Sequence, residues 1–147
     1  MKIIKGNLKN LLKFFILVFV FIITISFAFA LTGCVEKTVE VEKITLSKNV
    51  DINGNPTEES NSFKEGTKEI FLVTKVKNMK PTDNLTVKWV YLDKNLEINS
   101  KTFIPNKEFS GNHVFRIKIA QGFPFGDYEV SVFLNGTQLK TLPFKVN

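Results

Sequence analysis

Cysteine and histidine are almost absent from this sequence, with Cys34 and His113 the single example of each. One cysteine cannot form a disulfide within the chain, so the fold must be held together by packing alone. Metal centres usually need several histidine, cysteine or clustered carboxylate ligands, and a catalytic triad needs a base beside its nucleophile. We therefore expect His113 to be a surface loop residue, and we expect no metal, no cofactor and no enzymatic activity.

Acidic residues are absent from the first 33 positions, which carry four lysines. A run that is apolar except for Thr24 and Ser26 follows these lysines and covers residues 14–31. A basic segment, an apolar core and small residues before a cleavage site are typical of an export signal. Because lysine bias keeps the basic end in the cytoplasm, we expect the chain after Leu31 to lie on the extracytoplasmic side of the cell membrane.

The sole cysteine follows this run directly, in the sequence Leu31-Thr32-Gly33-Cys34. This tetrapeptide resembles the lipobox of prokaryotic lipoproteins. The resemblance implies that Cys34 carries a diacylglyceryl group and that residues 1–33 are a removed signal peptide. Two acyl chains hold a protein at a membrane far more firmly than one. The alternative is an uncleaved membrane helix over residues 11–31, since a span needs about 20 apolar residues.

Removing residues 1–33 from the 147 of the chain leaves 114, enough for one domain with its own core. The leader takes four of the 20 basic residues and none of the 14 acidic ones, so the remainder has a net charge of +2. Its acids and bases alternate along the chain, whereas nucleic-acid binders concentrate basic residues. We expect a tether over residues 34–43, a folded domain over residues 44–147 and no nucleic-acid partner.

Short segments with alternating apolar and polar residues fill the expected domain, and helical spacing is nowhere sustained. After a first edge strand near residues 44–48, this period of two predicts strands over residues 69–76, 85–92, 96–103, 113–120, 128–134 and 138–146. The intervening polar segments 49–67, 105–112 and 121–127 are expected to be loops. Asn135-Gly136 predicts a tight hairpin, because a type I′ turn needs positive φ at both positions. About seven short strands predict an all-β antiparallel sandwich.

Two aromatic positions sharpen this prediction. Trp89 lies in the middle of the strand expected at 85–92, and Tyr128 opens a later strand after Gly126-Asp127. This arrangement is similar to the immunoglobulin-like fold, which has a core tryptophan and a tyrosine corner. Val130 stands where disulfide-bearing members of the fold place a cysteine. The segment 123–130 also looks like one found in small bacterial and archaeal surface lipoproteins of unknown role.

Three phenylalanines do not all fit the inward faces of these strands. Phe123 and Phe125 flank Pro124 in one turn, and Phe133 lies one strand away. They are candidates for an exposed binding surface, with packing at the end of the sandwich core as the alternative.

Two further short sequence patterns concern possible glycosylation and calcium binding. Asn84-Leu85-Thr86 and Asn135-Gly136-Thr137 match the glycosylation sequon. Asp51, Asn53 and Asn55 begin a calcium-loop pattern that fails at the following positions, so a turn-rich loop is expected there.

These observations predict a lipid-anchored, non-catalytic binding module for an envelope protein or glycan. An accessory or inhibitory subunit of an envelope enzyme or transporter is one alternative, and a small hydrolase, which would need a cleft with converging titratable groups, is another.

Overall fold

The computed structural model describes residues 13–17 and 37–147. The chain divides into two compact units, Met1–Glu36 and Lys37–Asn147. Residues 13–17 are helical and exposed, while Cys34 and most of the expected helix 11–31 lie outside the described residues. Within the described residues, no helix combines the length and apolar character that crossing a membrane requires.

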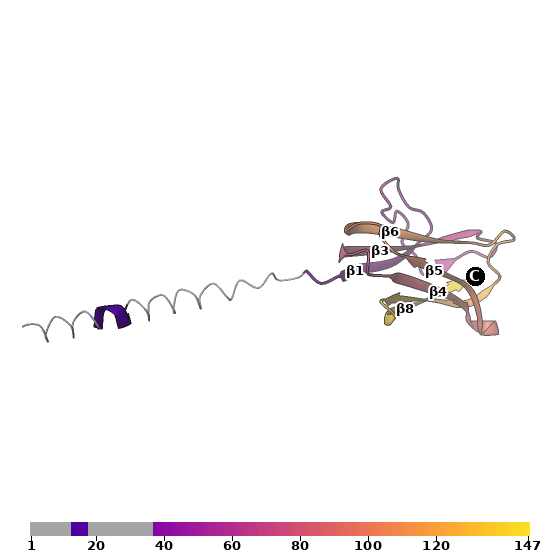
Figure 1. Ribbon diagram of the computed structural model, residues 1–147. Helices are drawn as coiled ribbons and strands as arrows, with labels where there is room; N and C mark the ends of the chain where they lie inside the picture. Colours follow the sequence, from indigo (N-terminus) through magenta and orange to yellow (C-terminus); the bar gives the residue numbers. More distant parts are fainter. Residues whose placement is uncertain (1–12, 18–36) are drawn as a thin grey trace, which may run out of the picture. The chain divides into compact units, whose positions relative to one another are not determined.

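Residues 37–147 form two β-sheets packed face to face (Figure 1). One sheet has three strands in the order β1-β3-β6, and the other has five in the order β2-β8-β7-β4-β5. The strands are β1 (Glu40–Ser47), β2 (Ser62–Phe63), β3 (Glu69–Met79), β4 (Leu85–Tyr91), β5 (Leu96–Phe103), β6 (Phe109–Lys118), β7 (Gly126–Leu134) and β8 (Thr137–Val146). All neighbours pair antiparallel except β2 and β8, which are parallel.

The inward faces of the strands are those that the alternation predicts. On β3, every second residue is fully buried, namely Ile70, Leu72, Thr74 and Val76. The same holds for Leu85, Val87 and Trp89 on β4, and for Tyr128, Val130 and Val132 on β7. The predicted all-β sandwich is therefore confirmed, with the short β2 as an additional strand.

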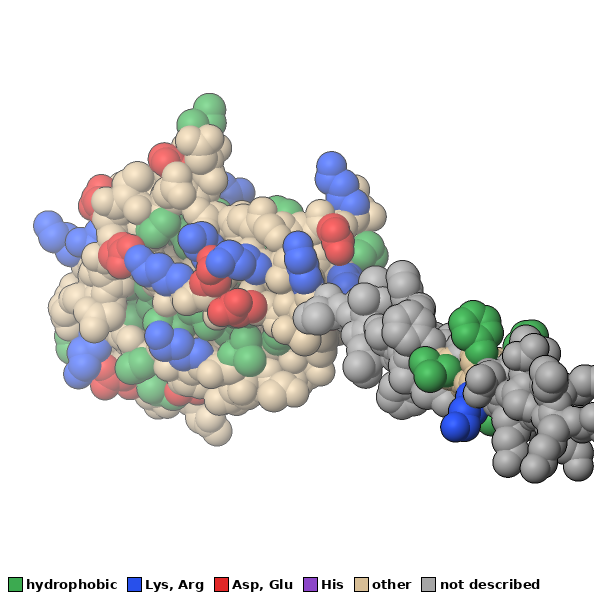
Figure 2. Space-filling model, turned by 90° about the vertical axis from the view of Figure 1, so that its left-hand side faces the viewer, with side chains coloured by type: hydrophobic (Ala, Val, Ile, Leu, Met, Phe, Trp, Pro, Cys, Tyr) green, Lys and Arg blue, Asp and Glu red, His purple; other side chains and the backbone are tan. Residues whose placement is uncertain are grey.

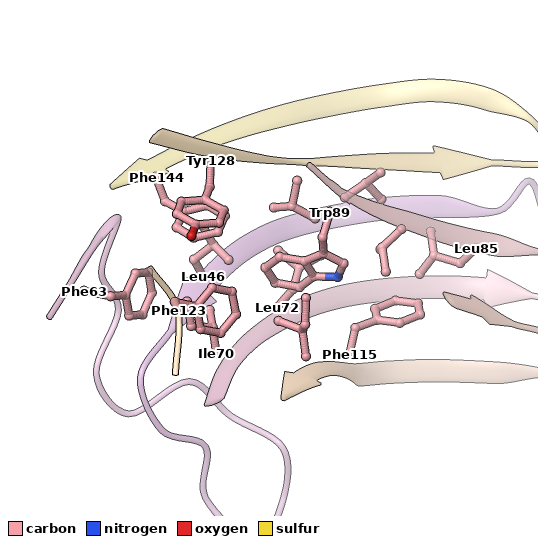
Figure 3. Packing of buried hydrophobic residues seen from close by; sticks show 14 of the residues in the cluster. Leu46, Phe63, Ile70, Leu72, Leu85, Trp89, Phe115, Phe123, Tyr128 and Phe144 are labelled. Atoms are coloured by element: carbon pink, nitrogen blue, oxygen red, sulfur yellow. The ribbon is translucent and has the colours of Figure 1, made fainter. Parts of the chain in front are cut away.

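An aromatic cluster forms the centre of the core (Figure 3). Trp89 meets Phe144 edge-on at 5.9 Å between ring centroids, and Phe144 stacks on Tyr128 at 5.1 Å. Phe63 closes the cluster with a second edge-on contact to Phe144 at 5.7 Å. Such pairs add to the free energy gained from apolar burial alone, which suits a domain without a disulfide.

The strands differ from the sequence prediction at three places. β1 begins at Glu40, four residues before the first strand expected near residues 44–48. β2 lies inside the expected loop 49–67, and its Phe63 is 2% exposed. β6 begins at Phe109, so the expected loop 105–112 is wrong over its last four positions. Asn78 in β3 has φ of 54° and Gly111 in β6 has φ of 150°, and the register between these strands shifts there. This irregularity interrupts the alternation that defines a strand in the sequence.

The segment after β1 forms a turn-rich loop, as expected. Isolated bridges join Ser47 to Glu59 and Val50 to Pro56. The Asp51 carboxylate accepts hydrogen bonds from the backbone N–H groups of Asn53 and Asn55, at 2.9 and 2.7 Å. These bonds hold the pKa of Asp51 below its usual value, with the Asn55 side chain as the largest cause. Asp51 is therefore a turn-forming residue.

The two ends of the sandwich carry different loops. The β1 end, where β1 begins, carries loop 80–84, loop 104–108 and the turn at residues 135–136. The distal end lies opposite and carries the loops at residues 64–68, 92–95 and 119–125. Asn135 and Gly136 have φ of 50° and 80°, which confirms the predicted hairpin between β7 and β8.

Candidate binding surface

The structure separates the three phenylalanines that the sequence groups together. Phe123 is 1% exposed and packs against Tyr128 at 5.7 Å, so it is a core residue. Phe125 is 65% exposed at the distal end. Phe133 is half-buried in β7, with the Lys88 ammonium 5.6 Å from its ring centre. The prediction of one surface from all three is wrong, because the loop folds Phe123 back into the core.

The distal end instead carries an apolar groove, here called the distal groove, with a volume of about 580 Å³. Its lining includes Tyr91, Leu96, Ile98, Ile119, Pro124 and, among polar residues, Glu65, Lys94 and Gln121. Leu96 is 52% exposed. Binding sites are commonly grooves of this size, with apolar walls and a few polar groups.

Two tyrosines hold one side of the distal groove in place. The Tyr128 hydroxyl donates a hydrogen bond to the Pro124 carbonyl at 2.8 Å, four residues earlier. This bond is the tyrosine corner that the sequence predicts. The Tyr91 hydroxyl donates to the next carbonyl, that of Phe125, at 3.0 Å. Both bonds fix loop 119–125 against the five-stranded sheet.

The environment of these tyrosines keeps both hydroxyls protonated. Burial, with smaller contributions from Tyr91 and Asp93, raises the pKa of Tyr128 to about 12. Burial and the Asp93 carboxylate also raise the pKa of Tyr91. Because each hydroxyl acts as a donor, the loop contacts persist across the physiological pH range.

Two glycines allow the distal loops to meet closely. Gly122 has φ of 87°, and a Cβ atom there would lie 2.5 Å from the Gly66 Cα. Gly126 has φ of 147°, and its Cβ atom would lie 2.5 Å from an Asp93 carboxylate oxygen. Side chains are excluded at both positions by space as well as by backbone conformation.

A second groove of about 610 Å³ lies beside β1 and β8 at the β1 end. It combines apolar Val41, Leu134 and Leu139 with charged Glu42 and Lys140. Figure 2 shows acidic and basic side chains interspersed over one face of the molecule, with hydrophobic side chains between them. The lining of this second groove includes four charged residues, Glu40, Glu42, Lys43 and Lys140, whereas that of the distal groove includes two, Glu65 and Lys94. The distal groove is therefore the better candidate for an apolar partner.

His113 lies in β6 and not in the surface loop that the sequence predicts. Its ring stacks on Phe103 at 3.7 Å between centroids and meets Phe115 edge-on at 4.6 Å. Burial lowers the pKa of His113 from 6.5 to about 4, so the ring is neutral at pH 7. Ser110 accepts a hydrogen bond from the Asn78 backbone N–H at 3.0 Å. Within residues 13–17 and 37–147, no group of three histidine, cysteine or carboxylate residues is placed to hold a metal ion.

The two sequons meet at the β1 end. The Asn84 backbone N–H donates to Asn135 Oδ1 at 2.8 Å, and Asn135 Nδ2 donates to Asp83 Oδ1 at 2.8 Å. The Asn135 backbone N–H also donates to the Asn84 carbonyl at 2.9 Å. Asn135 thus joins the β7–β8 turn to loop 80–84, and glycosylation of Asn84 or Asn135 stays a prediction.

No protein-family model and no curated protein match this sequence. Among solved structures, an immunoglobulin-like protein of Pseudomonas aeruginosa matches with a TM-score of 0.53 and 11% identity, over 77% of this chain and 99% of that one. The sensor domain of the anti-sigma factor RsgI4 from Pseudobacteroides cellulosolvens matches with a TM-score of 0.44 and 15% identity, over 73% and 89% of the two chains. An alkylpurine DNA glycosylase of Pseudomonas fluorescens matches with a TM-score of 0.46 and 13% identity, over 74% of this chain and 30% of that one. The first of these likenesses, together with Trp89 and the tyrosine corner, shows that residues 37–147 form an immunoglobulin-like β-sandwich.

Proposed function

We propose that this chain is a membrane lipoprotein, anchored through Cys34, whose extracytoplasmic sandwich binds a protein of the cell envelope through the distal groove. The single observation that carries the proposal is an apolar groove at the end of the sandwich opposite the start of β1. Exposed Leu96 and Phe125 lie at this distal end. Apolar surface gathered at one site of a soluble domain marks an interaction surface.

The short chain between Cys34 and β1 supports a membrane-near position for the β1 end. The chain from Cys34 to Glu40 spans at most about 20 Å when fully extended. A lipid on Cys34 therefore keeps the β1 end near the membrane. The 11 residues of β3 span about 35 Å at the usual rise per residue. The distal groove lies about one strand length from the start of β1, and we propose that a partner reaches it at this end of the domain.

The chemistry of the groove favours a protein over a glycan. Glycan sites often present an open aromatic face for stacking. One face of Tyr91 is stacked on Tyr128 at 4.6 Å, and the Lys94 ammonium lies 5.9 Å from the Tyr91 ring centre. The apolar lining also includes the aliphatic residues Leu96, Ile98 and Ile119, while its other aromatic ring, Phe123, is only 1% exposed and offers no face for stacking.

An accessory or inhibitory subunit of one envelope enzyme or transporter is the second candidate. It uses the same anchor and the same groove, and it differs in having one stoichiometric partner. We propose no catalytic role, because a reaction needs converging titratable groups with a nucleophile or general base. The sole histidine instead packs between Phe103 and Phe115.

Site-directed crosslinking in native membranes tests the proposal. A photoreactive amino acid replaces Leu96 in the full-length chain, and a matched variant carries it at Leu139. The two leucines are similarly exposed, at 52% and 43%, but lie at opposite ends of the sandwich. We expect a discrete protein adduct from position 96 that is absent from position 139. Equal adducts from both positions, or only lipid adducts from position 96, would contradict the proposal.

A further inference from the structure

The distal groove lies beside a free sheet edge. β5 is the last strand of the five-stranded sheet and pairs only with β4 within residues 37–147. An outer edge of this kind offers a row of backbone N–H and C=O groups. Leu96 and Ile98 belong both to β5 and to the lining of the groove. The free backbone edge and the apolar groove therefore form one continuous surface.

The C-terminal half of β5 is closed off from this surface. The Lys101 ammonium donates a hydrogen bond to the Arg116 carbonyl of β6 at 2.6 Å. Phe103 stacks on His113 of the same strand. These contacts bridge the two sheets toward the β1 end, so the accessible part of the edge is the half beside residues 96–100.

The edges at β1 and at β8 are protected against pairing with another chain. β1 has a register shift between Val41 and Lys43, and its Glu42 pairs with Lys75 and Lys77. β8 carries Pro143, which has no N–H group, and β2 pairs with its end at Lys145 and Val146. Bulges, charges, proline and covering segments are the usual protection of edge strands. β5 has a register shift of its own, with Ile98 as the extra residue between Glu97 and Asn99. Residues 96–100 nevertheless carry no proline, and within residues 37–147 no strand other than β4 pairs with them.

We propose that the distal groove binds an extended peptide segment of the envelope partner, which adds to β5 as a further strand beside residues 96–100. Alternate peptide residues form backbone hydrogen bonds with β5, and apolar side chains of the peptide enter the groove between β5 and loop 119–125. Strand addition draws affinity from backbone pairing and specificity from pockets for alternate side chains. Only a polypeptide backbone matches the donor and acceptor spacing of a strand edge.

Charges of both signs lie near this edge, which leaves an apolar peptide as the best match. Glu97 lies 4.0 Å from Lys88 of β4, and Lys101 is bonded to β6. The groove lining contains one basic residue, Lys94, and one acidic residue, Glu65. The surface therefore carries no excess of one sign that would require a highly charged ligand.

Peptide display with the full-length chain in lipid nanodiscs tests this inference, which rests on the proposed function. Random 12-residue peptides are selected on the wild-type protein, and enriched sequences are synthesised for affinity measurement. We expect alternating apolar residues in the enriched peptides. Leu96→Glu is expected to weaken binding by about tenfold or more, as for a central interface residue. Leu139→Glu is expected to leave it unchanged. Fluorescence of Trp89, the sole tryptophan and fully buried, reports whether each variant is folded.

N-methylation of the peptide backbone distinguishes strand addition from other modes of binding. Methyl groups at alternate residues, whose N–H groups face β5, are expected to abolish binding, and those at the intervening residues are expected to have little effect. If the effect of N-methylation on binding does not alternate along the peptide, strand addition is overturned. The absence of any enriched peptide would overturn it too. Either result leaves the crosslinking test intact, because a folded protein surface could still give an adduct from position 96. An equal loss of peptide affinity in the Leu96→Glu and Leu139→Glu variants would also overturn the inference.

Discussion

Tyr91 and Tyr128 stack at 4.6 Å, and their hydroxyls bond to adjacent carbonyls of the same loop, those of Phe125 and Pro124. The pair connects β4 and β7 to loop 119–125 and so shapes one wall of the distal groove. Tyr128 is 1% exposed, whereas Tyr91 is half-buried. The two hydroxyls therefore make comparable bonds in different environments, which allows their contributions to be separated.

Removal of the Tyr128 hydroxyl is expected to destabilise the domain. Tyr128→Phe should lower the free energy of unfolding by about 1–2 kcal/mol, because it leaves the Pro124 carbonyl without its buried donor. Tyr91→Phe should cost less, since water can replace its hydrogen bond. Urea unfolding followed by Trp89 fluorescence measures both values. A larger loss for Tyr91→Phe would show that the tyrosine corner is not the main support of the loop.

Close contact at Gly122 should make this position intolerant of any side chain. Gly122→Ala places a Cβ atom 2.5 Å from the Gly66 Cα, so we expect a loss above about 3 kcal/mol or failure to fold. Gly136→Ala is the matched control, because its φ is also positive, at 80°, but nothing lies within 4 Å of its Cβ atom. Backbone strain alone should cost it about 1 kcal/mol. Similar losses in the two variants would refute steric contact as the cause.

His113 should make the domain sensitive to mild acid. Its pKa is about 4 in the fold and 6.5 in the unfolded chain, so the unfolded state binds a proton first as the pH falls. The stabilisation from the neutral ring is complete above pH 6.5 and decreases toward pH 4, by less than about 3 kcal/mol because solvent screens the partly exposed ring. His113→Phe removes the titrating group and should flatten this part of the profile. Urea unfolding between pH 7 and pH 4.5 provides the comparison, and parallel profiles for the two proteins would contradict the assignment.

The Asn135 side chain should contribute to stability through its bonds to loop 80–84. Asn135→Ala removes the bonds to the Asn84 N–H and to Asp83 Oδ1 and places alanine at a φ of 50°. We expect a loss of about 1–2 kcal/mol. Asn53 also precedes a glycine but is exposed in the loop after β1, so Asn53→Ala should change stability by less than about 0.5 kcal/mol. Thermal unfolding of the pair measures the difference, and equal losses would count against an anchoring role for Asn135.

The sequence predicts the parts of the fold in which each residue obeys a local rule. Alternation places Ile70, Leu72 and Val76 in the core, and Asn135-Gly136 gives the hairpin. The tyrosine corner is predicted because Tyr128 occupies a characteristic place before its strand. These features depend on neighbours in sequence, on period and on backbone conformation.

The features that the sequence does not predict depend on contacts between distant segments. Phe63 is buried because β2 pairs with β8, and no period of two marks a strand of two residues. Phe123 is buried because loop 119–125 turns toward Phe144, at 6.5 Å between ring centroids. The distal groove is likewise formed by β5 and a loop that follows it by about 20 residues. Only Phe125, among the residues proposed from sequence for a surface, lies exposed at this end.

The mass of the N-terminal peptide, from protein extracted from its own membranes, decides whether the chain is anchored as a lipoprotein through Cys34. We expect a chain that begins at Cys34 and carries a diacylglyceryl group on its sulfur. That result would fix export, anchoring and the short distance between the membrane and the β1 end. A chain that begins at Met1, or a Cys34 thiol without lipid, would contradict the lipoprotein anchor and the orientation of the distal groove derived from it.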